Sequence, residues 1–162
     1  MQQLIKLSRL SRLPRNALQE IFGDHAVLDS GATSTFIKPG HGAEPTGEKS
    51  SKIVRVPNGQ SMIASEKAML PNKKLRDKAR ECGILPGLHK DSLVSVGKLA
   101  DAEYYTIFVP GNQGVQIFDG TKLNIFLPGE AILRGWRDHQ GLWRVPIKDE
   151  EFALPKKSWK NL

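Results

Sequence analysis

One stretch decides the fold of this chain: residues 26–37, which read AVLDSGATSTFI. Its first three residues are apolar and predict a buried strand, and Asp29 stands where that strand ends. Ser30 and Gly31 favour turns, so the chain is expected to turn back directly after the carboxylate. The last five residues are rich in β-branched and aromatic side chains, which predicts a second strand. The stretch therefore places one carboxylate at the tip of a buried strand.

Three other interpretations of this stretch stay open. Asp, Ser and Gly all favour turns, so DSGA could be an ordinary corner between a strand and a turn. Residues 29–34 also match the DSGxxS pattern of phosphodegrons. That function needs an exposed, flexible segment, whereas apolar residues lie on both sides of this one. Asp29 could instead cap a helix, but the β-rich residues 33–37 favour a strand.

The loop resembles the active-site loop of retropepsin-like aspartic proteases, above all those of copia-type retrotransposon polyproteins. The resemblance implies that Asp29 is the catalytic residue. Peptide hydrolysis by this route needs two aspartates, because a water molecule is held between two carboxylates that share one proton. The chain has one such loop, so the resemblance implies a homodimer with its active site on the two-fold axis. Ser30 and Gly31 would shape the pair of aspartates, and Ala32 and Thr33 would line the substrate groove.

The resemblance continues downstream and covers about residues 24–147. Residues 53–63 predict two strands joined by an Asn-Gly turn. In copia-type proteases a similar stretch leads to the flap, a mobile hairpin that covers the substrate. The second strand is expected to continue as far as Leu70. The family has glycines near the tip of the flap, whereas this chain has Ser65-Glu66-Lys67 at the expected position.

A second block of the resemblance lies at residues 84–99. There the family has an apolar strand that ends in glycine, here Gly97, and packs beneath the active-site loop. Residues 98–102 then predict one short helix. Three more strands are expected from their β-branched and aromatic content, at residues 104–109, 115–118 and 123–127.

The expected fold is mostly β: a retropepsin-like small β-barrel, partly closed, with one short helix and the active site at a homodimer interface. The chain of 162 residues is expected to form one core. Residues 1–20 are interpreted as a basic, flexible leader, residues 21–125 as the protease domain and residues 126–162 as a C-terminal extension. Within the extension, residues 133–146 resemble the segment that leads toward the integrase in retrotransposon polyproteins. The polar residues 39–52 predict an exposed loop between two hairpins.

Composition excludes several classes of site. The single cysteine, Cys82, excludes an internal disulfide and a multi-cysteine zinc site, and it indicates a reducing compartment. The resemblance implies neither a metal nor an organic cofactor. No apolar run reaches the ~20 residues that span a membrane, so no membrane partner is expected. The apolar fraction of 39% is low for a self-sufficient globule, which agrees with a core completed by dimerisation.

The chain is basic, with a formal net charge of +7. Two clusters hold much of the excess: Lys6, Arg9, Arg12 and Arg15 near the N-terminus, and Lys73, Lys74, Arg76, Lys78 and Arg80 further on. Such clusters could bind RNA. A solvated charged face is favoured, because no aromatic stacking platform lies between the charges. The N-terminal cluster also matches organelle transit peptides in composition, but a leader derived from a polyprotein is favoured.

The predicted function is that of an aspartic-type endopeptidase that processes a retrotransposon polyprotein, with a polypeptide as substrate. The expected location is intracellular, in the cytoplasm or in a virus-like particle. The alternative is a catalytically inactive module, derived from a retrotransposon, that binds a partner or RNA. The unusual residues at the expected flap tip favour the inactive module, and the intact DSGAT loop favours the enzyme.

Overall fold

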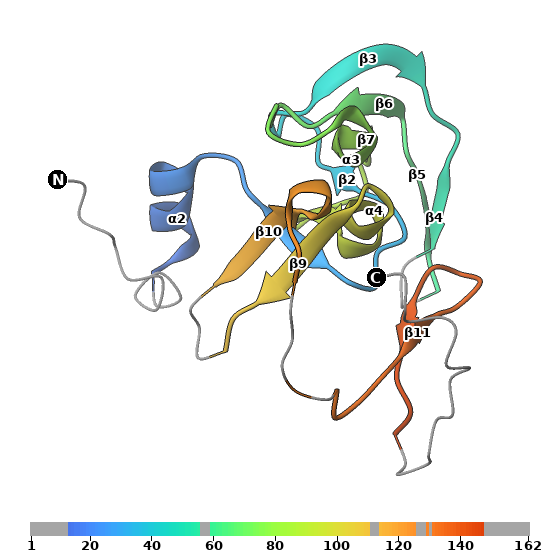
Figure 1. Cartoon of the computed structure of the whole chain (residues 1–162). Coiled ribbons are helices and arrows are strands. Elements are labelled where there is room, and N and C mark those ends of the chain that lie inside the picture. Colours follow the sequence, from blue (N-terminus) through green and yellow to red (C-terminus); the bar gives the residue numbers. More distant parts are fainter. Residues whose placement is uncertain (1–12, 56–58, 111–113, 126–128, 130, 148–162) are drawn as a thin grey trace, which may run out of the picture.

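The computed structural model describes residues 13–55, 59–110, 114–125, 129 and 131–147. These residues form a mostly β structure, as the sequence predicts. A six-stranded sheet carries most of the fold, and two-stranded hairpins and short helices lie around it (Figure 1). The sheet is open, with β1 and β3 at its two edges. The expected barrel therefore does not close within the described residues.

The six strands of the main sheet are, from one edge to the other, β1 (Ala26–Asp29), β8 (Ser92–Ser95), β2 (Phe36–Ile37), β7 (Glu81–Ile84), β6 (Glu66–Met69) and β3 (Glu44–Lys49). The predicted strand before Asp29 is confirmed as β1. β1 runs parallel to β8, and β2 runs parallel to β7. Parallel neighbours need long crossover connections. β8 accordingly reaches the side of β1 only after the chain has passed through all the strands from β2 to β7.

The three hairpins are β4 (Ile53–Arg55) with β5 (Ser61–Ile63), β9 (Tyr104–Phe108) with β10 (Val115–Asp119), and β11 (Trp136–Arg137) with β12 (Trp143–Arg144). The predicted hairpin at residues 53–63 is confirmed, with Ile53 opposite Ile63. The strands predicted at residues 104–109 and 115–118 are confirmed as β9 and β10. The strand predicted at residues 123–127 is wrong over its first three residues, which form no strand, and its end lies outside the described residues.

The helices are α2 (Arg15–Phe22), α3 (Asp77–Arg80), α4 (Val96–Asp101) and the 3₁₀ turn η1 (Gly120–Lys122). The prediction of one short helix is therefore wrong in number. It is also wrong about where the helix begins, because α4 starts at Val96 and contains Gly97. The cause is Ser95, whose side chain accepts a hydrogen bond from the backbone N–H of Lys98 and so caps the helix two residues earlier than expected.

Two further predictions near β3 are wrong. Residues 39–52 were expected to form a loop, but β3 lies within them and pairs with β6. All six residues of β3 are exposed, so this edge strand depends on main-chain hydrogen bonds and carries no apolar pattern that would predict it. The strand expected to run from residue 61 to Leu70 is interrupted, because β5 ends at Ile63 and β6 begins at Glu66.

The buried side chains form three small clusters. In the first, Leu28 of β1 and Val94 of β8 pack against Leu99 of α4. In the second, Val54 and Met62 of the β4–β5 hairpin pack against a group that contains the buried Phe36. The third joins residues of β2, β6 and β7. The first two clusters fix the strand that carries Asp29 and hold the hairpin against the segment that follows it.

Candidate functional site

Asp29 lies at the carboxyl end of β1, where it is half-buried. In the parallel pair of β1 and β8, Asp29 is directly opposite Ser95. Both strands end at this point, so the loop after Asp29 and the start of α4 leave the sheet side by side. A rigid sheet edge with a polar loop is a common position for functional side chains, because the strands hold the loop in place.

The turn after Asp29 is closed by the carboxylate itself. The backbone N–H of Gly31 donates a hydrogen bond to Asp29 Oδ1 over 2.7 Å. A Cβ atom at position 31 would lie 3.3 Å from the same oxygen. Glycine is thus favoured here by a close approach to the carboxylate, since the φ angle of Gly31 is not in the positive range. The sequence predicts a turn at Gly31, and the structure adds this close approach as a reason for glycine.

Buried hydroxyl groups connect the loop to β8 and α4. Ser95 is fully buried, and its Oγ donates to the backbone oxygen of Ala32. Thr35, which is also buried, accepts a hydrogen bond from the backbone N–H of Ser95 over 3.2 Å. The sequence analysis missed both residues. Serine is a favoured N-cap residue, and extending the helix predicted at residues 98–102 back to Val96 would have placed Ser95 at this cap.

The remaining predicted site residues line the outer side of the loop. Ser30, Gly31 and Thr33 are exposed, and Ala32 is half-buried. Their side chains are available to a second molecule at the surface. Among the described residues, the structure contains one loop of this kind.

The β4–β5 hairpin lies against the same loop, because Val54 and Met62 contact the cluster around Phe36. Its turn contains Gly59, whose φ of 83° is one that favours glycine, and residues 56–58 lie outside the described residues. The position expected for the flap tip, residues 65–67, is wrong. Lys67 lies within β6 opposite Gly83 of β7, where no hairpin tip can form. The side chains at residues 65–67 therefore do not count against a working flap.

A cavity of about 620 Å³ opens beside the loop, under the base of the hairpin. Ser34 lines it from the end of the Asp29 loop, Phe36 from β2, Lys52 from the base of the hairpin and Lys98 from α4, and most of its other lining residues belong to β3, β6 and β7. The ammonium group of Lys52 donates to Ser34 Oγ over 2.7 Å. Burial, and secondly the charge of Lys98, lower the pKa of Lys52. Lys52 and Lys98 thus both line this cavity, next to the candidate catalytic loop.

The C-terminal hairpin also reaches the site. Arg137 of β11 forms an ion pair of 2.5 Å with Asp101 of α4. The same guanidinium group lies where a Cβ atom on Gly97 would stand, at 2.6 Å. In the turn between β11 and β12, a Cβ atom on Gly141 would lie 3.7 Å from Thr33 of the active-site loop. The extension thus contacts α4 through Arg137 and approaches the loop at Gly141, which the sequence did not indicate.

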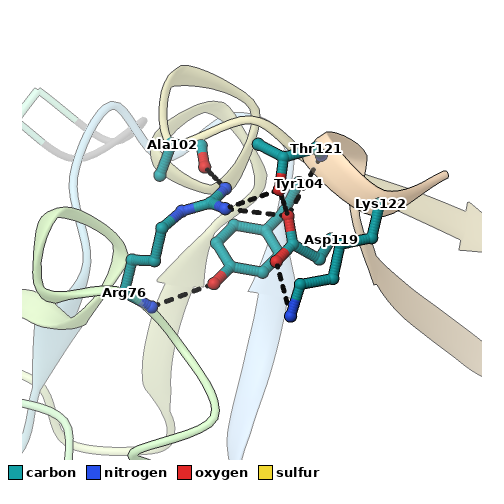
Figure 2. Close-up of polar contacts among 6 residues, drawn as sticks. All are labelled: Arg76, Ala102, Tyr104, Asp119, Thr121 and Lys122. Carbon is teal, nitrogen blue, oxygen red and sulfur yellow. Dashed lines mark hydrogen bonds and ion pairs between the residues drawn. The ribbon is translucent and has the colours of Figure 1, made fainter.

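Figure 2 shows that part of the second basic cluster is used inside the fold. Arg76 forms an ion pair of 2.7 Å with Asp119, and its guanidinium group lies 4.4 Å from the ring centre of Tyr104. Hydrogen bonds, first from Thr121 and then from Arg76, lower the pKa of Asp119 to about 2. The hydrogen bond to Asp119 is also the largest cause of the raised pKa of Arg76. This group joins the start of α3 to β9 and β10, and its role is structural.

Arg80 is occupied in the same way. Its Nε donates to the backbone oxygen of Leu70 over 2.8 Å, and its Nη1 lies 2.9 Å from a carboxylate oxygen of Asp77. Lys78 donates to the backbone oxygen of Asp101. Lys73 and Lys74 are exposed. In the first basic cluster, Lys6, Arg9 and Arg12 lie outside the described residues, and so does the side chain of Arg15.

The described residues contain no group of three or more His, Cys, Asp or Glu side chains arranged to bind a metal ion. Cys82 is half-buried, and burial raises the pKa of its thiol to about 11, so it is a poor nucleophile. None of the described helices has the length and apolar character that crossing a membrane requires.

Comparison of the chain with protein-family models, with curated proteins and with solved structures found no match. The features of the fold that bear on a function are the Asp29 loop, the β4–β5 hairpin that packs against the segment after it and the cavity beside them.

Proposed function

We propose that the chain is one subunit of a homodimeric aspartic endopeptidase of the retropepsin type, in which each copy contributes Asp29. The observation that carries the proposal is the setting of this carboxylate. It is half-buried at the end of β1, and one of its oxygens accepts the N–H of Gly31. Within the described part of the chain, the other oxygen has no hydrogen-bond donor. It is therefore available to water or to a second carboxylate.

The proposed chemistry needs both copies of Asp29. When two carboxylates lie close together, one stays ionised and the other keeps its proton. The ionised one takes a proton from the bound water, whose oxygen forms a bond with the carbonyl carbon of the peptide. The protonated one gives its proton to the carbonyl oxygen. The tetrahedral intermediate then breaks its C–N bond, and the amine leaves with a proton returned by the carboxylate pair.

An exposed apolar surface supports the dimer. Phe108 and Val115 are opposite each other in the β9–β10 pair, and Ile117 lies two residues further along β10, so the three share one face. Their exposed fractions are 60%, 40% and 40%. Ile117 and Leu28 line one cavity of about 310 Å³, so this face lies next to β1. β1 is itself an edge strand of the main sheet, which leaves main-chain groups for a second copy to pair with.

The β4–β5 hairpin supports the endopeptidase part of the proposal. It has a glycine in its turn and packs against the segment after the active-site loop through Val54 and Met62. In this place it can cover a polypeptide that lies over Asp29 and exclude water from it. An extended substrate would bind by main-chain hydrogen bonds, and cavities beside the loop would select its side chains. A retrotransposon polyprotein is the substrate that the sequence resemblance favours.

The test is cleavage of a proteome-derived peptide library by the purified chain, with the cleaved bonds identified by mass spectrometry. Asp29→Asn should abolish cleavage, because an amide keeps the shape of the side chain but cannot act as a base. Asp24→Asn is the matched control, since Asp24 is an exposed aspartate five residues upstream that accepts a hydrogen bond from Gln19. Cleavage that survives Asp29→Asn would refute the proposal. A chain that cleaves nothing and binds RNA tightly would instead support the inactive module.

A further inference from the structure

The cavity beside the active-site loop has an excess of positive charge. Four lysines and two glutamates line it: Lys49, Lys52, Lys67, Lys98, Glu48 and Glu81. Two of the lysines have carboxylate partners. Lys67 lies 2.6 Å from Glu48, and Lys98 lies 3.9 Å from Glu81. Both glutamates are thereby engaged, and Lys49 and Lys52 supply the excess.

Of these two lysines, Lys52 is the one whose ammonium group has defined side-chain contacts. Its ammonium group donates to Ser34 Oγ, which is buried, and lies 5.7 Å from the ring centre of Phe36. No carboxylate among the described residues forms an ion pair with it. Lys52 is exposed, so an incoming carboxylate can reach its ammonium group. Partial burial, and secondly the positive charge of Lys98, lower the pKa of Lys52, and a bound carboxylate would offset the repulsion between the two lysines.

The cavity is connected to the catalytic loop on two sides. Ser34 lies five residues after Asp29 in the same loop. Lys98 follows Ser95, whose side chain bonds both the Lys98 backbone N–H and the Ala32 backbone oxygen. Lys52 directly precedes β4, so it marks the base of the hairpin. A polypeptide held between the loop and the hairpin therefore passes the mouth of this cavity.

We propose that the cavity is a substrate subsite for an acidic side chain, aspartate or glutamate, and that Lys52 binds its carboxylate while Lys98 adds favourable charge. This inference rests on the proposed function, because it assumes that a polypeptide lies over Asp29. The volume of the cavity falls within the range of about 300–1,000 Å³ typical of ligand pockets, which leaves room for the side chain and its neighbours. A charge-assisted hydrogen bond of this kind corresponds to about a tenfold preference for Glu over Gln.

The experiment uses a synthetic peptide library that is randomised with equal amounts of Glu and Gln. Wild-type chain should cleave peptides enriched about tenfold in Glu at one fixed position relative to the cut bond. Lys52→Met keeps the length of the side chain and should lose the enrichment while still cleaving Gln peptides. Lys52→Glu should reverse the preference in favour of Gln. Lys73→Met is the control, because Lys73 is an exposed lysine that does not line this cavity, and it should leave the preference unchanged.

Retention of the same library on immobilised chain separates this inference from the proposed function. If the library is cleaved without any acidic preference, or if Lys52→Met keeps the preference, the subsite is overturned and the protease stands. If no peptide is cleaved, the proposed protease function is overturned. The composition of the peptides retained on the immobilised chain then tests the subsite. Glu enrichment that Lys52→Met removes supports it, and equal retention of Glu and Gln peptides overturns it.

Discussion

Replacing Ser95 with alanine should release the active-site loop from the sheet. The Oγ of Ser95 accepts the N–H of Lys98 at the start of α4, and loss of such a cap costs about 1 kcal/mol. The same Oγ donates to the backbone oxygen of Ala32. Leaving a partly buried carbonyl without a donor costs roughly 1–3 kcal/mol, and the lower half of this range applies because Ala32 is only half-buried. The free energy of unfolding should therefore fall by about 2–3 kcal/mol, and peptide cleavage should fall with it.

The assay is urea unfolding followed by circular dichroism, with amide hydrogen exchange measured in the folded state. Ser92→Ala is the matched control, because Ser92 is a buried serine of the same strand whose Oγ accepts the backbone N–H of Lys38. Its Oγ also lies 3.4 Å from His41 Nδ1, so the substitution should cost about 1–2 kcal/mol for these two contacts. Only Ser95→Ala should speed exchange at Gly31 and Lys98. A loss below about 1 kcal/mol, or equal exchange in both variants, would refute the role assigned to Ser95.

Three more predictions follow from the fold and the site. The pKa of Asp119 is lowered to about 2 in the folded chain, so its contribution to stability is complete above about pH 4 and is lost as the pH falls toward 2. In Asp119→Asn, the free energy of unfolding measured between pH 5 and pH 2 should fall less steeply than in the wild-type chain. Leu99→Ala should lower the free energy of unfolding by about 2–5 kcal/mol, because Leu99 is 1% exposed and packs beneath β1 and β8; thermal unfolding checks this. Cleavage per subunit should fall on dilution, as the dimer dissociates, and should rise in mild acid, where one aspartate of the pair is protonated. A constant rate per subunit at every concentration would contradict a shared site.

Local patterns in the sequence predicted the elements that depend on local forces. β1 has three consecutive apolar residues before Asp29, and the β4–β5 hairpin has an Asn-Gly turn between β-branched strands. β3 could not be predicted in this way, because its residues are all exposed and carry no apolar pattern, and its pairing with β6 rests on main-chain hydrogen bonds and on the ion pair between Lys67 and Glu48. The start of α4 at Val96 depends on the hydrogen bond from the backbone N–H of Lys98 to Ser95 Oγ, which helix propensity alone does not predict.

The contacts that complete the site join residues far apart in the chain. Arg76 meets Asp119 across 43 residues, and Arg137 meets Asp101 across 36. Composition assigned Arg76 to a basic surface, whereas the fold gives it a carboxylate and an aromatic ring. In the same way, Lys52 is an ordinary lysine in the sequence and becomes notable only when the fold places it beside Ser34 and Lys98.

The parallel pairing of β1 with β8 has a consequence for the order of events during synthesis. Ala32 and Ser95 are separated by 63 residues, so the Asp29 turn has no partner when it leaves the ribosome. At about 5–20 residues per second, translation of that interval takes roughly 3–13 s. Contacts of such long sequence separation also form slowly in folding. The nascent chain therefore carries an unassembled turn until α4 has been made, and Asp29 becomes ordered only after the chain has been synthesised beyond Ser95 and Lys98.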